Sequence, residues 1–465
     1  MLKTILSLSI GLALSACAFS PDSSLPVTQL PVATSKVSVN PNWWTQFNDP
    51  TLNQLIATAL ENNQNLALIT ARVDESRAKL GIAASAQLPR IDIVGGGGRS
   101  EQSRNITGSN PIVSSDYKLA AQASWEIDLW GRVRNSTFAA KQDLMAVEYN
   151  RDAARLALSA EVAQNYFNLR ALDDQLDITK NTIQSRLESF DLQQKRYRGG
   201  VTSELDVKQS EVELASAQSN LPDFTEAIAR TESALSVLIG QSPRAMMDEG
   251  IARGKSIPEL QIADPIPAEL SSDLLLKRPD IAQAEANLMV ARARIQVARA
   301  AYFPTISLTG LLGIESKNLN NLFSSNSNIW SFSGNLAMPL FNSGLTAAQV
   351  EQAKAQEKQA VAQYQQAIQI AFSETRTSLI SNRTVTEKTA FEQKQVNALK
   401  VQLKLAKLRY DNGYSSYLEV LDAQRSLFNT QLNLVKAQRN QINARVELYK
   451  ALGGGWEKVA NNPLN

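Results

Sequence analysis

The sequence predicts a mainly α-helical protein with a smaller membrane β-barrel part, built from two copies of one structural unit. A polar, glycine-bearing turn, RYRGGVTSELDV at residues 196–207, recurs as RYDNGYSSYLEV at residues 409–420, with six of twelve positions identical. A stretch without Pro or Gly precedes each turn, from Arg132 to Arg198 and from Leu345 to Asn412. Segments of alternating polarity come before these stretches, which is typical of half-buried strands.

The composition excludes several classes of function. The 465 residues include 47 basic and 45 acidic side chains, so the basic surplus that duplex binding requires is missing, and we expect no nucleic acid partner. Histidine is absent and there is one cysteine, which removes the usual general base, the commonest metal ligand and any intrachain disulfide. The carboxylates are scattered along helix surfaces. We therefore expect no enzyme, no metal site and no cofactor.

The chain opens with a predicted lipoprotein signal peptide, residues 1–16. Lys3 is the only early charge, and the apolar run after it is too short to cross a bilayer as a helix. The sequence LSAC, which ends at Cys17, resembles the lipobox of bacterial lipoproteins, and this resemblance implies cleavage before Cys17 and a covalent lipid on it. Ala18 follows instead of Asp, which by the lipoprotein rule implies the outer membrane. The alternative is ordinary cleavage that leaves Cys17 as a buried free thiol.

Residues 17–64 are predicted to form a lipid-anchored arm and a short equatorial helix. Asp49 can cap this helix and Pro50 can open it. Trp43 and Trp44 are interpreted as packing anchors of the arm, with a stacking platform for a ligand as the alternative.

Each repeat then begins with an alanine-rich helix, at residues 65–91 and 280–306, that a proline ends. A pair of strands follows, at about 90–128 in the first repeat and 305–340 in the second. Apolar residues hold the odd positions from Tyr117 to Ile127, and alternation recurs over 306–314 and 330–338, while a shorter partner strand starts at Ile91. One apolar and one polar face over about ten residues is typical of strands that line a wet barrel in a membrane.

Two local features of these segments have competing interpretations. Gly95–Gly98 could suggest a phosphate loop, but no Gly-Lys-Ser/Thr follows, so we expect a strand or turn. Four aromatic residues either mark the membrane interface or pack ordinarily: Tyr117, Trp125, Trp130 and Trp330.

Four strands per chain cannot close a barrel, for which about eight is the practical minimum. Oligomerisation is therefore required if the strands span a membrane. Two chains would supply eight strands and three would supply twelve; the pattern does not choose between them, although the long helices favour the larger number.

The long helices are predicted to form coiled-coil hairpins with tips near 199–203 and 412–416. Apolar residues recur every seven positions from Leu169 to Tyr197 and from Val207 to Leu235, and the second copy repeats this with an interruption at Gln441. The helices before the tips, 67 and 68 residues long, would reach about 100 Å, the length of a strut or tube. Pro222 is expected to kink the return helix of the first hairpin.

The predicted organisation is thus a signal peptide, an arm, two repeats joined by a proline-bearing connector, and a tail. The boundaries are 1–16, 17–64, 65–240, 241–279, 280–452 and 453–465, in that order.

Several motifs in order along the chain carry a family resemblance. They are the two turns together with WWTQFNDPTLNQLIATALENNQNL (43–66), EIDLWGRVR (126–134), RPDIAQAEANL (278–288), FPTISLTG (303–310), LDAQRSLF (421–428) and ELYKALGGGW (447–456). With them the chain resembles the outer membrane factors of Gram-negative efflux systems, the TolC/OprM type, and most closely the OprM-like lipoproteins. The resemblance implies a homotrimer with a twelve-stranded outer membrane barrel and a long periplasmic α-helical barrel.

The resemblance also implies a function and partners. The closed periplasmic tip would meet an adaptor protein and an RND-type inner-membrane transporter of a multidrug pump, and the trimer would serve as a passive exit duct for drugs and other small molecules. Alternatives within this class are an exit duct for type I protein secretion or for metal-ion efflux. A structural coiled-coil lipoprotein of the outer membrane would explain the heptads but not the alternating strands.

Site residues follow from the same resemblance. Leu418, Glu419 and Asp422 match positions of the periplasmic constriction, and Leu418 and Asp422 share a helix face. Asp206 and Tyr410 match a pair that links neighbouring hairpins. The adaptor-contacting tips would be Gly200, Val201, Thr202, Gly413, Tyr414 and Ser415.

Two points about these residues stay open at the level of sequence. Ser415 stands where the TolC pattern has the arginine of the lock, and Arg196, Arg198 or Arg409 is a candidate substitute. The acidic residues also lie in first helical turns, where carboxylates complement the helix dipole without any role in gating.

Overall fold

The computed structural model describes residues 24–26, 40–103, 105, 112–248, 250–260 and 278–456. The predicted signal peptide and Cys17 lie outside these residues, as do part of the connector and the tail beyond residue 456. None of the helices in the described ranges combines the length and the apolar character that a bilayer-crossing helix needs.

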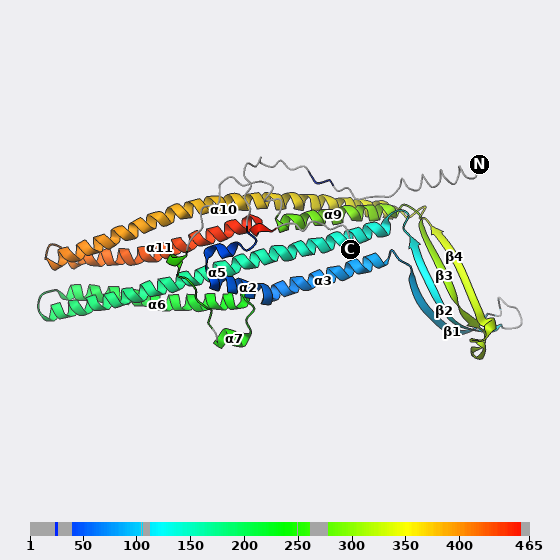
Figure 1. Cartoon of the computed structure of the whole chain (residues 1–465), viewed down its shortest axis with the longest axis horizontal. Coiled ribbons are helices and arrows are strands. Elements are labelled where there is room, and N and C mark those ends of the chain that lie inside the picture. Colours follow the sequence, from blue (N-terminus) through cyan, green and yellow to red (C-terminus); the bar gives the residue numbers. More distant parts are fainter. Residues whose placement is uncertain are drawn as a thin grey trace. The chain divides into compact units, whose positions relative to one another are not determined.

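The described chain is mainly helical and contains one sheet (Figure 1). Its principal elements, in order, are α2 (Pro50–Asn62), α3 (Gln64–Ser85), β1 (Arg90–Glu101), β2 (Val113–Ile127), α5 (Arg132–Arg198), α6 (Glu204–Leu238), α7 (Pro243–Asp248), α9 (Pro279–Ala300), β3 (Thr305–Ser316), β4 (Asn328–Ala337), α10 (Leu345–Asp411) and α11 (Tyr417–Ala451). Short 3-10 helices include Trp43–Phe47 and Ile257–Glu259. The order helix, two strands, very long helix, shorter helix therefore occurs twice.

The chain divides into two compact units. One contains the sheet with residues 24–26, 71–148 and 283–365, and the other contains the remaining described residues, including both helical hairpin tips. The helices α5 and α10 each run through 67 residues, and α6 continues through Pro222 without interruption.

The sheet is antiparallel throughout, in the order β1-β2-β3-β4, so β1 and β4 are its edges. Gly95–Gly98 all lie within β1, which at 12 residues is longer than the short partner expected from Ile91 and Ile93. The reason that glycines occupy β1 lies in the paired strand, β2. Gly97 pairs with Tyr117, and a Cβ at Gly97 would come within 2.9 Å of the Tyr117 ring, so the glycine leaves room for that ring.

Apolar side chains of the sheet are exposed in the single chain. Ile93 is 82% exposed and Trp330 is 79% exposed. Trp130, in contrast, packs locally, because its Nε1 donates to the Pro304 carbonyl at 2.7 Å and its ring stacks on Phe303. Of the aromatic residues with two interpretations, Trp130 is thus a packing residue and Trp330 faces outward.

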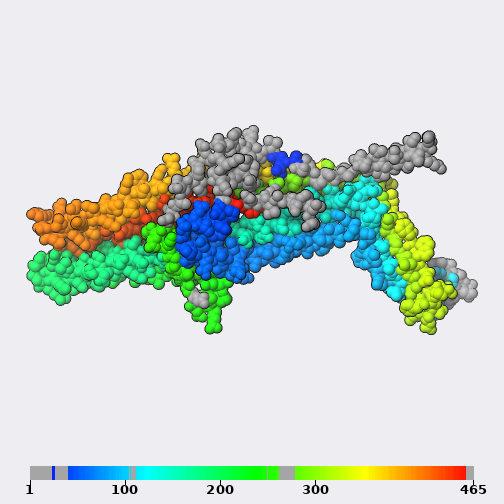
Figure 2. All heavy atoms as spheres, in the orientation of Figure 1, coloured from blue at the N-terminus to red at the C-terminus, as the bar shows by residue number. Residues whose placement is uncertain are grey.

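The core of the second unit forms around the residues that precede α2. Trp43 is fully buried and its ring stacks on Tyr449 with 5.6 Å between centroids, while Phe47 meets Phe167. Asp49 caps α2 by accepting hydrogen bonds from the backbone N–H groups of Thr51 and Leu52. Packing is therefore the role of Trp43. Figure 2 shows α7 as a green protrusion near the blue α2 region, and Met247 at this protrusion is 86% exposed.

Candidate gating site at the hairpin tips

The first tip, residues 199–203, is a glycine-dependent reversal between α5 and α6. Gly200 adopts φ +70°, the left-handed conformation that glycine tolerates, and the N–H of Val201 donates to the Arg196 carbonyl at 2.8 Å. Ser203 then caps α6 in a capping box with Asp206. The Asp206 carboxylate also accepts a hydrogen bond from the Thr202 hydroxyl at 2.6 Å.

The second tip repeats the reversal without the capping box. Gly413 adopts φ +75°, and the N–H of Tyr414 donates to the Arg409 carbonyl at 2.8 Å. Ser416 occupies the N-cap position of α11, but its side chain makes no capping hydrogen bond. Val201 and Tyr414 are exposed at their respective tips, so each turn presents an unburied apolar side chain.

Polar and aromatic contacts join the two hairpins next to these turns. The Tyr410 hydroxyl lies 3.2 Å from Gln193 Oε1 and donates to it. Arg196 forms an ion pair with Asp411 at 3.2 Å, and its guanidinium lies 5.3 Å from the centroid of the Tyr410 ring. Tyr410 also packs against Tyr417, and burial raises the pKa of Tyr417. The tip of α5 is therefore attached to the start of the second turn.

Within the described residues, Asp206 and Tyr410 do not bond to each other. Asp206 binds the start of its own helix, and Tyr410 binds Gln193. A lock between Asp206 and Tyr410 stays a prediction for the assembled protein.

The three candidate arginines have different partners. Arg196 reaches the other hairpin through Asp411. Arg409 faces Glu419 at 3.7 Å within the second hairpin, and Arg198 contacts Gln194 of its own helix. Of these three candidates, Arg196 is thus the arginine whose ion pair reaches the other hairpin.

The predicted constriction residues occupy one side of the start of α11. Leu418, Glu419 and Asp422 are exposed, and Leu418 is 57% exposed. Tyr417 and Val420, on the opposite side, are buried against α10. This arrangement leaves Leu418 and Asp422 free to face other copies of the chain or an aqueous passage.

An ionic cluster behind the tips, with two of its three side chains buried, has no counterpart among the residues singled out in the sequence. It consists of Arg186 on α5, Glu213 on α6 and Arg425 on α11. The sequence did contain a signal for this cluster: polar residues recur on α5 at spacings of four and seven, and the structure buries them. The row is Gln175, Thr179, Arg186 and Gln193.

The apolar heptads concealed this row. Leu169 is buried, but Tyr197 at the end of the same heptad series is 46% exposed. The reason is that α5 contacts α11 as well as α6: Gln175 donates to the Leu432 carbonyl, and the Arg186 guanidinium lies 5.3 Å from the centroid of the Phe428 ring. A helix with two partners needs two buried faces, and only one of them is apolar here.

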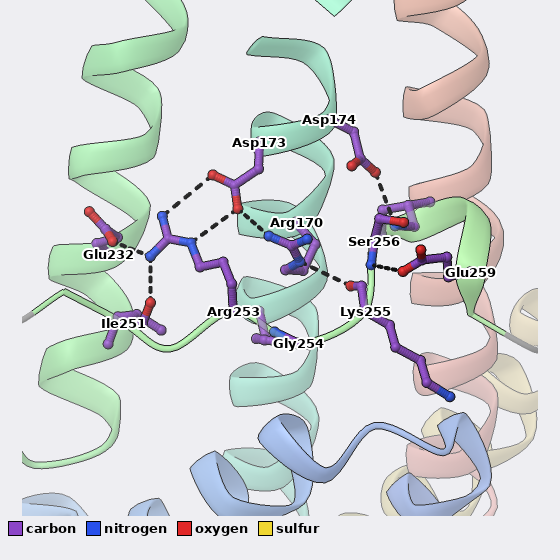
Figure 3. Close-up of polar contacts among 12 residues, drawn as sticks. Arg170, Asp173, Asp174, Glu232, Ile251, Arg253, Gly254, Lys255, Ser256 and Glu259 are labelled. Carbon is purple, nitrogen blue, oxygen red and sulfur yellow. Dashed lines mark hydrogen bonds and ion pairs between the residues drawn. The ribbon is translucent and has the colours of Figure 1, made fainter. Parts of the chain in front are cut away.

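A second polar cluster lies at the end of the first hairpin that is far from its tip. There residues 250–260, which we call the strap, cross α5 and α6 (Figure 3). Arg253 bridges the two helices by pairing with Asp173 on α5 at 3.1 Å and with Glu232 on α6. Arg170 donates to the Lys255 carbonyl at 3.0 Å and to Asp173 at 2.6 Å.

The carboxylate next to this bridge holds the end of the strap. Asp174 accepts a hydrogen bond from the Ile257 N–H at 3.0 Å, and burial raises the pKa of Asp174. Ser256 and Glu259 form a capping box for the 3-10 helix that follows. The strap therefore holds α5 and α6 together at the base of the first hairpin.

Comparison with known proteins identifies the family. The outer membrane efflux protein family matches residues 55–241 and 270–454. The solvent efflux pump outer membrane protein SrpC of Pseudomonas putida is 36% identical over 426 residues, which cover 89% of this chain and 87% of that protein. The cation efflux system protein CusC of Escherichia coli O157:H7 is 32% identical over 464 residues, covering 98% and 99%.

A solved structure agrees with these relatives. The CmeC outer membrane channel of Campylobacter jejuni superposes with a TM-score of 0.90 and 29% identity, over 96% of each chain. The family resemblance seen in the sequence motifs is confirmed, and so is the outer membrane location that it implies. The chain is a member of the outer membrane efflux protein family.

Proposed function

We propose that the chain is the outer membrane channel subunit of a tripartite, RND-type multidrug efflux pump, a passive exit duct opened at its periplasmic tip by an adaptor and an inner-membrane transporter. The observation that carries the proposal is that one chain supplies a sheet with two open edges and two long hairpins with matching tips. Neither part encloses a passage by itself.

A homotrimer completes both parts. Pairing the β1 edge of one copy with the β4 edge of the next turns three four-stranded sheets into a closed barrel of twelve strands. Closure also provides a lipid environment for outward apolar side chains such as Ile93 and Trp330. Six hairpins, two from each copy, would form the periplasmic helical barrel. A lipid on Cys17 would anchor each copy to the outer membrane.

The constriction in this assembly is assigned to Leu418, Glu419 and Asp422. They share the exposed side of α11, and three copies of Asp422 around one axis would favour cations over anions. Asp206 and Tyr410 of adjoining hairpins would lock the tip, with Arg196 as the arginine of that lock. The turn residues around Thr202 and Ser415 would receive the adaptor.

The cargo is proposed to be drugs and other small molecules. The relative SrpC is named for solvent efflux, which supports this class. Metal-ion efflux is a second candidate, because CusC is named for cation efflux. The adaptor distinguishes the two. Thr202→Cys provides a single free thiol for crosslinking in cells, because the proposed lipid occupies the sulfur of Cys17, and the captured adaptor assigns the system.

Channel activity is tested directly in planar bilayers. The purified protein is expected to migrate as a heat-modifiable trimer and to conduct ions, with larger conductance for Asp422→Ala because the constriction loses its carboxylates. Absence of conductance in both proteins would contradict the channel proposal and favour a structural coiled-coil lipoprotein.

A further inference from the structure

The carboxylate of Glu213 joins arginines from two different hairpins. Its Oε1 accepts hydrogen bonds from Arg425 Nε at 3.0 Å and Nη2 at 2.7 Å, and its Oε2 lies 3.2 Å from Arg186 Nη2. Arg186 also donates through Nη1 to the backbone carbonyl of Glu213. Arg186 and Glu213 belong to the first hairpin, α5 and α6, whereas Arg425 belongs to α11 of the second.

The burial of the three side chains is unequal. The side chains of Arg186 and Glu213 are 4% and 7% exposed, but that of Arg425 is 54% exposed. Separating Arg186 from Glu213 would leave a buried charge without a partner, which is strongly unfavourable. Withdrawing Arg425 leaves a neutral Arg186–Glu213 pair inside the first hairpin and moves an already half-solvated guanidinium into water. The cluster can therefore divide at one bond only, the bond between the hairpins.

The position of this bond relates it to the tip. Arg186 precedes Gln193 by one heptad, Glu213 follows Asp206 by one heptad, and Arg425 follows Leu418 by one heptad. Seven residues of helix correspond to about 10 Å. The cluster thus forms a second layer of hairpin contacts directly behind the layer at the tip.

A groove of about 240 Å³ lies beside the cluster among α5, α10 and α11. It opens to solvent, and its lining includes Arg186, Leu403 and Phe428. Apolar packing between the hairpins is therefore not continuous at this level.

We propose that the Arg425–Glu213 bond is a second, separable latch that holds the second hairpin against the first and must open before the channel does. Arg425 acts as a positioning residue for gating, and Arg186 keeps Glu213 paired in both states. This inference rests on the proposed channel function.

The test uses the full-length trimer in planar bilayers, with open probability and unitary conductance measured separately. Arg425→Met keeps the aliphatic stem and removes the guanidinium, and it is expected to raise the open probability about tenfold or more, the worth of one hydrogen bond to a charged group. Arg425→Lys keeps the charge and should fall between Arg425→Met and the wild type. Lys436→Met removes an exposed charge from the same helix and should behave as the wild type.

The outcomes separate the latch from the channel itself. Unchanged open probability in Arg425→Met, and also in Arg425→Gln as a second variant, would overturn the latch. A change confined to unitary conductance would overturn it too, because Arg425 would then act only on ions in the passage. Either result counts against the latch only if the Asp422→Ala trimer conducts ions. If that trimer does not conduct, the channel function and the latch are refuted together.

Discussion

Gly254, in the strap, is expected to be one of the positions least tolerant of a single added methyl group. A Cβ there would lie 2.4 Å from Asp49 Oδ1 and 2.5 Å from the Tyr166 hydroxyl. These two groups are hydrogen-bonded to each other at 2.6 Å, and Asp49 also caps α2. Gly254→Ala must therefore displace the strap or break a buried hydrogen bond and a helix cap.

The magnitude follows from those two losses and from the cost of overpacking. A cap contributes about 1 kcal/mol, a buried hydrogen bond about 1 kcal/mol, and overpacking costs about 1–3 kcal/mol. Since the same atoms are involved, the terms overlap, and we expect Gly254→Ala to lower the free energy of unfolding by about 2–4 kcal/mol. The midpoint of thermal unfolding, followed by circular dichroism in detergent, should fall accordingly.

Two further variants make the measurement decisive. Gly81 lies inside α3 with no atom within 4 Å of an added Cβ, so Gly81→Ala should stabilise the protein slightly. Tyr166→Phe removes one of the three obstructing oxygens, so its effect and that of Gly254→Ala should be less than additive in the double variant. Equal unfolding midpoints for Gly254→Ala and the wild type would refute the steric argument.

Three other predictions concern the anchor, the tip and the strap. Cys17→Ser should abolish lipidation, and persistent palmitate labelling would show the lipobox interpretation to be wrong. Tyr410→Phe combined with Asp206→Ala should loosen the closed tip and raise bilayer conductance, whereas unchanged conductance would remove the proposed lock. Burial raises the pKa of Asp174, so the folded state loses stability as the pH rises through and above the ordinary carboxylate range. Asp174→Asn should accordingly raise the thermal midpoint more at pH 8 than at pH 4, and an equal shift at both values would contradict this reasoning.

The helical and strand segments could be predicted from the sequence because their signals are local. Alternating polarity marks β2, and the absence of Pro and Gly over Arg132–Arg198 marks α5 with the same ends. The length of β1 was underestimated because its glycines have little strand propensity of their own. Their place in the ladder depends on Tyr117, which lies 20 residues further along the chain in the paired strand.

The candidate site shows the same division. Both turns could be located from Gly200 and Gly413, since the left-handed backbone that they adopt is a local requirement. The choice of Arg196 over Arg198 could not be predicted from the sequence. Residues two apart on a helix point in different directions, and only the packing of the two hairpins determines which of them pairs with Asp411.

Periodicity and short motifs were enough to predict the mainly helical class, the strand pairs, the two hairpin turns and the family. Which polar groups meet across the hairpins depends on how helices far apart in the chain pack together. Glu213 and Arg425 are 212 positions apart, and a carboxylate on a helix surface has the same local sequence signature whether it faces water or a partner. Where α11 docks beside α5 and α6, Arg425 meets a Glu213 side chain that is 7% exposed, so the docking of the two hairpins decides that these charges pair.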